Sequence, residues 1–513
     1  MQRQTNVAIP PLKQQIPPRP PAARRRRFIC PQRPAMRVLC INAGSSSVKV
    51  ALYEVDSTED SDDAKSCGAA HAAAAAAAAS SPDDGLDASE GGNLPPGVAL
   101  VVSKSLKQDE DPSATLKHFV EQQEREEQEH HAKLAQKGGD GTASAAAGPG
   151  CEPGHPHPIR LVVHRIVHGG TLFHAPTLLT PENVTKLETL NDLAPLHNPP
   201  ALKWIRAADK ALCHPAAADG SAGKEVRQVA IFDTSFFHEL PPVSQAYALP
   251  LDLLKKHHIR RYGFHGLAHE DMLRVLSEQR RKQRSETDST PVERGGRLVT
   301  LQLGSGCSAA AVLNGHPQDT SMGFSPLEGL MMATRCGDVD GALLAYLQSR
   351  EPSLAATAAG RPKALEEMLY YRSGMLGLSG GMSNDMRVLE RAVAAPGGNK
   401  DAQLALDFFH HRVVQRVGAY VATLGGLDSL AFGGGIGEHG ASVRAAVVEQ
   451  LAKFLPVRLD AAANEKASKS KNHTRISTPD SAVEVWVVKV DEAAIMLRDA
   501  LTLTQPRGQQ SQL

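Results

Sequence analysis

The chain has 513 residues, which is enough for two or three domains and more than one hydrophobic core. Its 56 Lys and Arg balance its 56 Asp and Glu, so no overall charge indicates nucleic acid or an anionic membrane as a partner. Seven cysteines without a CxxC pair argue against a disulfide framework or a zinc site, and no apolar run approaches the roughly eighteen residues of a membrane span. These features favour a soluble, intracellular, globular protein.

The first 35 residues differ from the rest of the chain. They are rich in proline, contain the basic run 24–27 and have no acidic residue, so we expect a disordered extension. One interpretation is a transit peptide for mitochondrial or plastid import. The prolines disfavour the amphipathic helix of a mitochondrial presequence, and the alternatives are a plain tail of a cytoplasmic protein or a true start at Met36.

The first folded elements follow directly. Residues 37–41 predict a strand, the polar run NAGSSS (42–47) predicts a tight turn, and residues 48–55 predict the returning strand. Residues 57–157 then combine acidic residues, an eight-alanine run, a charged helical stretch and a Gly/Ala/Pro-rich end. We interpret 57–157 as a low-complexity insertion into the first domain.

From residue 158 onward, strand-like and helical stretches alternate, which indicates an α/β architecture. The charged stretch that begins at residue 280 predicts a domain boundary. We therefore expect an N-terminal domain (36–56 and 158–279), a C-terminal nucleotide-binding domain (280–503) and a short tail (504–513).

One local pattern occurs twice, and each copy is a hairpin whose loop consists of Gly and Ser. The first copy is NAGSSSVKV (42–50), where Lys49 adds a cation, and the second contains GSGCS (304–308). Small residues let the backbone approach an anion, and their N–H and hydroxyl groups donate to phosphate oxygens. Two such hairpins predict a duplicated fold with a nucleotide clamped between the halves.

A third glycine cluster, 433–438, follows a predicted strand and precedes a helix expected to begin near Ser442. A glycine turn of this kind offers flat backbone to an adenosine and a positive helix terminus. A plain tight turn is the alternative.

Eight strings then indicate a family: INAGSSSVK (41–49), HRIVHGG (164–170), APLHNPP (194–200), FDTSFFH (232–238), RRYGFHG (260–266), DTSMGFSPLEGLMMATRCGD (319–338), GMLGLSGGMSNDMR (374–387) and FGGGIGEHG (432–440). In these strings and in their order the chain resembles the acetate kinase (acetokinase) family. The resemblance implies two duplicated ribonuclease H-like domains of the acetate and sugar kinase, Hsp70 and actin type, with a nucleotide cleft between them. It also implies a homodimer that reversibly transfers the γ-phosphoryl group of ATP to acetate, giving acetyl phosphate and ADP.

Such a reaction needs little covalent help, because acetate is already ionised; it needs cations that bring two anions together. Arginine forks suit both anions, and the resemblance implies that Arg165 binds acetate and Arg335 stabilises the transition state. It further implies that His265 donates to the transferring phosphoryl group and that His197 supports it. Asp233 matches the catalytic carboxylate, which we expect to orient Arg165 or a metal-bound water.

The remaining positions are also carried over by resemblance. The ligands of Mg²⁺ (or Mn²⁺) are expected to be Asn42 and Glu492. The ATP/ADP contacts are expected to be Ser45, Ser47, Lys49, Gln302, Leu303, Gly304, Ser305, Gly306, Asp385, Met386, Arg387, Gly435, Ile436, Gly437, Glu438 and His439. The acyl group is expected to contact Arg165, Val167, Leu196, His197, Phe264 and Pro326.

The sequence departs from the family pattern at two places. Residues 302–306 read QLGSG where the family has HLGNG, which predicts altered nucleotide affinity. An additional Phe in FDTSFFH leaves the role of His238 open. Three alternatives remain: a propionate or butyrate kinase, a member that uses pyrophosphate, and a non-kinase ATP-binding protein of the Hsp70/actin type.

Overall fold

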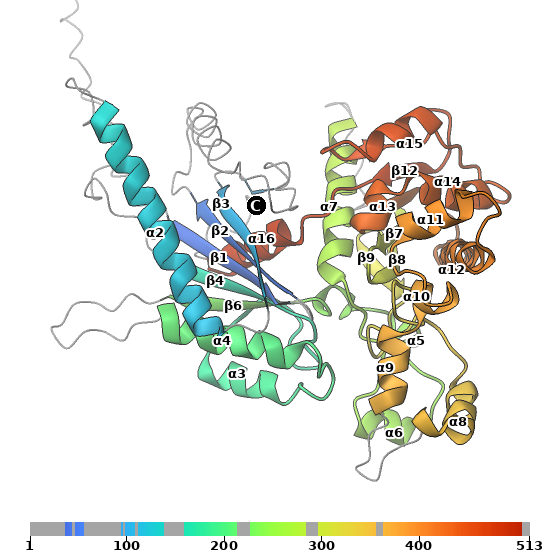
Figure 1. Cartoon of the computed structure of the whole chain (residues 1–513), viewed down its shortest axis with the longest axis horizontal. Coiled ribbons are helices and arrows are strands. Elements are labelled where there is room, and N and C mark those ends of the chain that lie inside the picture. The colour runs from blue at the N-terminus through green and yellow to red at the C-terminus, as the bar shows by residue number, and fades with distance from the viewer. Residues whose placement is uncertain are drawn as a thin grey trace, which may run out of the picture.

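The computed structural model describes residues 36–43, 47–55, 94–95, 98–107, 111–137, 159–212, 226–283, 296–354 and 363–504. The expected extension 1–35, most of the expected insertion and nearly all of the tail lie outside these residues. The described elements form two halves that lie side by side (Figure 1). In the described part of the chain, no helix combines the length and apolar character needed to cross a membrane.

Each half is built on one six-stranded sheet. The first sheet has the order β3-β2-β1-β4-β6-β5, with β1 Met36–Ala43, β2 Ser47–Val55, β3 Val98–Lys107, β4 Ile159–Ile166, β5 Thr177–Leu178 and β6 Arg227–Phe232. The second has the order β11-β12-β10-β7-β8-β9, with β7 Arg297–Leu303, β8 Cys307–Leu313, β9 His316–Thr320, β10 Ser429–Gly433, β11 Thr474–Arg475 and β12 Glu484–Val487.

The two sheets have the same topology. In each, three strands form an antiparallel meander, the first of them pairs in parallel with the fourth, and the fourth pairs in parallel with the sixth. The fifth strand pairs antiparallel at the edge. This equivalence confirms the duplicated α/β fold that the two hairpins predicted.

Strand β1 shows why its sequence is apolar throughout. Its side chains alternate between two buried faces: Leu39 and Ile41 pack in one apolar cluster, and Val38 and Cys40 pack in another on the opposite face. A strand that is covered on both sides reads as a continuous apolar run rather than as an alternating one.

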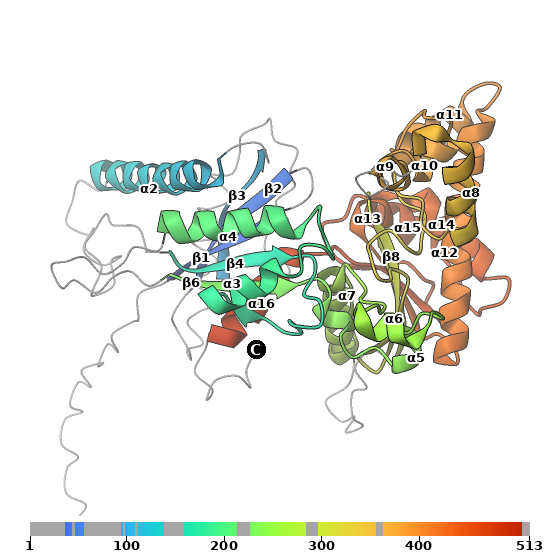
Figure 2. The same cartoon turned by 90° about the horizontal axis from the view of Figure 1, so that it is seen from below.

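The helices cover the faces of the two sheets (Figures 1 and 2). They are α2 Pro112–Lys137, α3 Pro181–Glu188, α4 Asn198–Leu212, α5 Pro242–Gln245, α6 Leu251–Lys256, α7 Gly266–Gln283, α8 Gly341–Arg350, α9 Lys363–Tyr371, α10 Gly374–Leu378, α11 Met386–Ala394, α12 Lys400–Leu424, α13 Gly434–His439, α14 Ala441–Leu451, α15 Ala461–Ala467 and α16 Glu492–Thr504, with 3₁₀ turns at Ser235–Phe237 and Pro352–Leu354.

Two helices do not fit the expected division into domains. The predicted boundary at residue 280 falls inside α7, whose Met272, Val275 and Leu276 pack against the second sheet. Helix α16, expected in the C-terminal domain, packs on the first sheet and lies in that half in both views (Figures 1 and 2). Its four large buried side chains, Ile495, Met496, Leu497 and Leu501, contribute roughly 6–12 kcal/mol of apolar burial before the entropic cost of ordering. The boundary is therefore wrong for these two helices.

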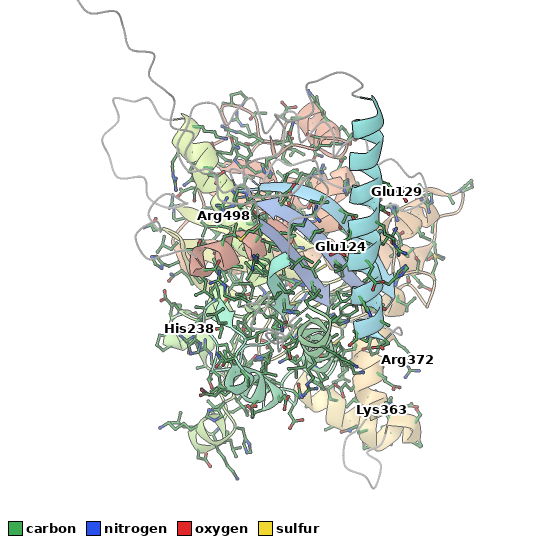
Figure 3. The ribbon with its side chains drawn as sticks, turned by 90° about the vertical axis from the view of Figure 1, so that its left-hand side faces the viewer. Glu124, Glu129, His238, Lys363, Arg372 and Arg498 are labelled. Atoms are coloured by element: carbon green, nitrogen blue, oxygen red, sulfur yellow. The ribbon has the colours of Figure 1, made fainter. Side chains whose placement is uncertain are left out.

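The expected insertion is also wrong in part. Strand β3, inside 57–157, pairs with β2 along its length and occupies the position that β9 has in the other sheet. Helix α2 buries Leu116 and Phe119 against the core, while Glu124 and Glu129 lie on its exposed side (Figure 3). The sequence did not predict this strand, because the low-complexity residues on both sides dominate the composition of the segment.

Candidate active site

Two of the four predicted catalytic side chains, Arg165 and Asp233, lie at the carboxyl ends of parallel strands. Asn42 and Arg165 are register partners near the ends of β1 and β4, and Asp233 directly follows β6. In the other half, Gln302 and Gly433 are register partners at the ends of β7 and β10. Ligands of open α/β sheets bind at this edge of the strands, so the topology gathers residues that are far apart in the chain.

Arg165 is held by two carboxylates. Its Nε and Nη2 donate to the two oxygens of Asp233 at 2.8 and 2.7 Å, and its Nη1 donates to Glu492 Oε2 at 2.7 Å. Nη1 also lies 3.4 Å from Asn42 Oδ1. Asp491 places Glu492, because its carboxylate accepts from the Ala494 N–H and so caps the start of α16.

Burial and charge act in opposite directions on this cluster. Burial raises the pKa of Asp233, and the guanidinium of Arg165 opposes the shift. Burial alone would lower the pKa of Arg165, but Asp233 and Glu492 raise it above its ordinary value. A forked contact with two short bonds is the geometry of an ionised carboxylate and a charged arginine, so Arg165 keeps a fixed orientation and its charge.

His265 lies immediately before α7 with a left-handed backbone, φ 59°. Its Nδ1 is 2.9 Å from Ser308 Oγ. A Cβ at Gly306 would lie 3.2 Å from His265 Nε2, so this nitrogen faces the glycine loop, and a side chain there would press against the imidazole ring. Burial, followed by Arg165, His269, Arg335 and His197, lowers the pKa of His265 well below its ordinary value, so the ring is neutral.

Arg335 approaches the same loop. A Cβ at Gly306 would lie 3.8 Å from Arg335 Nη1, which donates to Pro326 O at 3.1 Å. The Ala333 N–H donates to Ser305 O at 3.1 Å and ties the arginine's segment to the loop. The guanidinium lies over the ring of Tyr370, and burial lowers its pKa.

His197, in the turn before α4, completes the group. Burial, and then the positive charges of Arg335 and Arg165, lower its pKa to about 4. Electrostatic effects link His197 to Arg335 and Arg165, and His265 to all three, which indicates that the four side chains lie in one region. The site thus combines two arginines with two neutral imidazoles, a set suited to anions.

The loop 302–306 lies next to the third glycine cluster, 433–438, in space. A Cβ at Gly304 would lie 3.8 Å from Gly435 N, and one at Gly434 would lie 3.0 Å from Gln302 Nε2. The buried Oε1 of Gln302 has no hydrogen-bond partner among the described residues. Leu303 and Gly304 continue from the end of β7 into the loop, with Gly304 N donating to Gly306 O at 3.0 Å.

The third cluster forms the short helix α13 rather than a turn, and the next helix, α14, begins at Ala441, next to the predicted start near Ser442. Gly437 is buried, whereas Gly435 and His439 are exposed and Ile436 is half-buried. Glu438 accepts from Gly434 N and Val490 N, both at 3.2 Å, so its carboxylate anchors the backbone. Tertiary bonds of this kind override the low helix propensity of glycine.

Asp385, Met386 and Arg387 form the N-terminus of α11. Asp385 caps this helix through the Arg387 N–H at 2.9 Å, and its carboxylate also binds the exposed Arg387 side chain. Met386 is buried in the core of the second half. In the described residues, the side-chain hydrogen bonds of Asp385 and Arg387 are with each other.

The expected acyl contacts share an apolar environment. Val167 packs against the cluster that contains Phe264, Pro326 is buried, and Leu196 is half-buried directly before His197. A feature that motif reasoning missed braces this region: Tyr247 hydroxyl accepts from the Phe324 N–H at 2.7 Å and donates to Glu328, which also binds Arg261.

Other predicted positions are only partly described. Lys49 is exposed opposite Asn42 in the register of β1 and β2, which puts both side chains on one face. Ser45 lies outside the described residues, and Ser47 is described only as the first residue of β2. His238 stacks on His174 with 3.6 Å between the ring centroids. In the described part of the chain, His238 makes no contact with the site residues.

Three polar residues behind His265 were also missed: His269, Ser308 and Thr300, which are fully buried. His269 follows His265 by four residues at the start of α7, and this spacing is the one signal that sequence reasoning could have used. Thr300 lies in an apolar strand and has no motif of its own, whereas Ser308 belongs to the predicted Gly/Ser loop 304–308 but lies in β8 and bonds the two histidines.

Comparison with known proteins agrees with this geometry. The family model of the Acetokinase family matches residues 111–498. The chain is 34% identical to the acetate kinase of Fervidobacterium nodosum over 464 residues, which is 90% of this chain and 97% of that protein. The crystal structure of Porphyromonas gingivalis acetate kinase is 31% identical and covers 92% of this chain and 100% of its own, with a TM-score of 0.63. A propionate kinase structure from Francisella tularensis is 26% identical and covers 90% and 98%, also with a TM-score of 0.63. The chain therefore belongs to the acetokinase family of phosphotransferases.

Proposed function

We propose that this chain transfers the γ-phosphoryl group of ATP reversibly to acetate, with Arg165, His197, His265 and Arg335 around the reacting groups. The observation that supports this assignment is the approach of His265 and Arg335 to the loop 304–306, with Arg165 and His197 near enough for their charges to act on His265. In the forward step, an acetate oxygen forms a bond to the γ-phosphorus, the bond to the bridging oxygen breaks, and ADP leaves with the electron pair.

Each group has a role that follows from its surroundings. Arg165, oriented by Asp233, holds the acetate carboxylate. Arg335 offsets the charge that develops on the phosphoryl oxygens, and His265 donates a hydrogen bond from Nε2. Asp233 is a positioning residue rather than a general base, because both of its oxygens bind Arg165 and acetate needs no deprotonation.

The oxygen atoms near Arg165 fit a magnesium ion. Glu492 and Asn42 approach each other, with Asn42 Nδ2 3.5 Å from Glu492 Oε2, and offer few protein ligands, as Mg²⁺ prefers when it keeps waters and binds phosphates. No cluster of three or more His, Cys, Asp or Glu side chains that could hold a metal occurs among the described residues. We propose Asn42 and Glu492 as the residues that hold Mg²⁺ (or Mn²⁺), which would supply positive charge to the phosphate oxygens.

Hydroxamate formation from acetyl phosphate tests the site. We expect Arg165→Ala and Arg335→Ala to lose most activity while the control Arg458→Ala, which removes an exposed arginine paired with Asp480, keeps it. Wild-type activity in both site variants would contradict the assignment.

The choice of acid needs its own measurement. One methylene in an apolar pocket contributes only about 1–3 kcal/mol, and both acetate and propionate kinases are among the similar structures. We propose acetate, and kcat/KM for acetate, propionate and butyrate decides. A tenfold or greater preference for a longer acid would contradict the proposal.

ATP is proposed as the phosphoryl donor, supported by the glycine helix α13 beside the loop 302–306. In the reverse direction, ADP and orthophosphate can be compared as acceptors. Faster reaction with orthophosphate would favour the pyrophosphate-using alternative.

We also propose a homodimer. The segment 243–253 exposes large apolar side chains that a second copy can cover, namely Val243, Leu249, Leu251 and Leu253. Sedimentation velocity should show a dimer for the wild type and a monomer for Leu251→Glu. A monomeric wild type would contradict the proposed dimer.

For localisation we propose the cytoplasm, with mitochondrial or plastid import as the alternative. Mass spectrometry of the mature N-terminus separates them, since import predicts removal of much of residues 1–35.

A further inference from the structure

Behind His265 lies a chain of three buried polar groups, Ser308, His269 and Thr300, that the phosphoryl-transfer mechanism does not itself require. Ser308 Oγ lies 2.9 Å from His265 Nδ1 and 2.8 Å from His269 Nε2. His269 Nδ1 in turn lies 2.7 Å from Thr300 Oγ1. The groups come from the start of α7 and from the paired strands β7 and β8, so the chain runs from the reacting side of His265 into the core.

Counting protons leaves two arrangements. Burial lowers the pKa of His269 to about 3, and that of His265 also lies well below its ordinary value, so each ring carries one N–H. Each hydroxyl also has one proton to donate. All three bonds can then run either from Thr300 toward His265 or from His265 toward Thr300. If both rings instead donated to Ser308, the buried Ser308 hydroxyl proton would have no acceptor among the described residues.

Thr300, at the buried end of this series of hydrogen bonds, determines the direction in which the bonds run. If the bonds ran toward Thr300, its buried hydroxyl would need a further acceptor, and no such partner exists among the described residues. A buried donor without a partner costs about 1–3 kcal/mol. That direction would also turn a lone pair of His265 Nε2 toward the phosphate loop, where anionic oxygens are expected. Both effects favour the opposite direction.

We propose that Thr300, His269 and Ser308 form a one-way hydrogen-bond relay that holds His265 as the neutral tautomer with its proton on Nε2. Thr300 donates to His269 Nδ1, His269 Nε2–H donates to Ser308, and Ser308 donates to His265 Nδ1. His265 Nε2–H is then directed at the loop that contains Gly306. The three are positioning residues, and the importance of the relay for turnover rests on the proposed role of His265.

The left-handed backbone of His265 explains why the relay matters for the orientation of this side chain. Residues other than glycine rarely adopt that conformation, and only the surrounding structure keeps it. A ring held at one nitrogen by Ser308 cannot rotate freely, and the tautomer of a histidine is set by the hydrogen bond of its other nitrogen. The relay therefore fixes both the orientation of the donor and the position of its proton.

The test combines histidine NMR with kinetics on the full chain. In ¹⁵N-histidine-labelled enzyme without substrates, long-range ¹H–¹⁵N spectra should show protons on Nε2 of both His265 and His269, with His265→Gln and His269→Gln used for assignment. In Ser308→Ala, His265 should become a mixture of tautomers. The kcat should fall about 10- to 100-fold, as is typical when a residue that orients a functional histidine is lost, while both KM values stay unchanged.

Matched variants separate the relay from a loss of packing. Thr300→Val keeps the shape but removes the hydroxyl and should lower kcat, whereas Thr300→Ser should restore both kcat and the wild-type tautomers. Ser321→Ala removes a neighbouring buried hydroxyl that accepts only from the Ala309 N–H, and should leave the tautomers unchanged.

Two results would overturn the relay: a proton on Nδ1 of His265 in the wild type, or wild-type tautomers and kcat in both Ser308→Ala and Thr300→Val. The spectra are recorded without substrate, so a failure of the proposed function is distinguishable. A fully active His265→Gln with the expected wild-type tautomers would refute the role of His265 in turnover and leave the relay intact.

Discussion

Replacing Asp233 with Asn tests whether this carboxylate acts by holding Arg165. Asp233 is buried and accepts two hydrogen bonds from the guanidinium, at 2.8 and 2.7 Å. Asn keeps one acceptor oxygen and nearly the same shape but loses the negative charge and the second acceptor. The change therefore removes one charge-assisted bond, while Glu492 still binds Nη1 of Arg165.

The size of the effect follows from that bond. A hydrogen bond to a charged group contributes about 1.5–3 kcal/mol, and each 1.4 kcal/mol corresponds to a factor of ten. We expect kcat/KM for acetate to fall about 10- to 100-fold, mainly through a higher KM for acetate, with the KM for ATP unchanged. Hydroxamate or coupled assays over an acetate series measure both constants.

A second Arg–Asp pair provides the control. Asp428 binds the Arg297 side chain and its backbone N–H at the start of β7 and β10, the opposite end of these strands from the site, and Asp428→Asn should leave the acetate KM unchanged. Wild-type constants in Asp233→Asn, or equal losses in both variants, would refute the role of Asp233 in orienting Arg165.

Three further variants probe other parts of the molecule. Gly435→Ala should fold normally, since nothing lies within 4 Å of its Cβ, but should raise the KM for ATP; an unchanged KM would argue against nucleotide contact there. Tyr247→Phe leaves the Phe324 N–H without its acceptor and should lower the free energy of unfolding in urea by about 1–3 kcal/mol, whereas unchanged stability would contradict the brace. Burial and then Asp499 raise the pKa of Glu270, so its stabilising contribution is lost as pH rises above its ordinary 4.5. The thermal midpoint of Glu270→Gln should therefore rise relative to that of the wild type as pH increases. A difference between the two midpoints that does not change with pH would refute this.

Sequence reasoning recovered what is encoded locally. Apolar runs bounded by glycine predicted strands such as β1, β7 and β10, and family strings predicted that Arg165, His265 and Arg335 share a site. It failed where contacts between residues far apart in the sequence determine the structure. Strand β3 is defined by its pairing with β2 rather than by its flanks, and α16 is assigned to the first half by the apolar face that it covers.

The same limit applies to the polar groups of the site. Asp233 could be predicted because it lies in a family string, whereas Thr300 and Ser308 are single hydroxyls in buried strands. Their importance depends on three-dimensional neighbours, since a hydroxyl that bonds two imidazoles has no signature along the chain.

The return of α16 to the first sheet has a consequence for synthesis on the ribosome. One face of β1 and β4 is covered by Ile495, Met496 and Leu497, which are made almost last. The first half therefore cannot complete its core while the chain is still being translated, although domains usually fold in order from the N-terminus. Glu492, the partner of Arg165, arrives in the same step, so assembly of the carboxylates around that arginine coincides with completion of the fold.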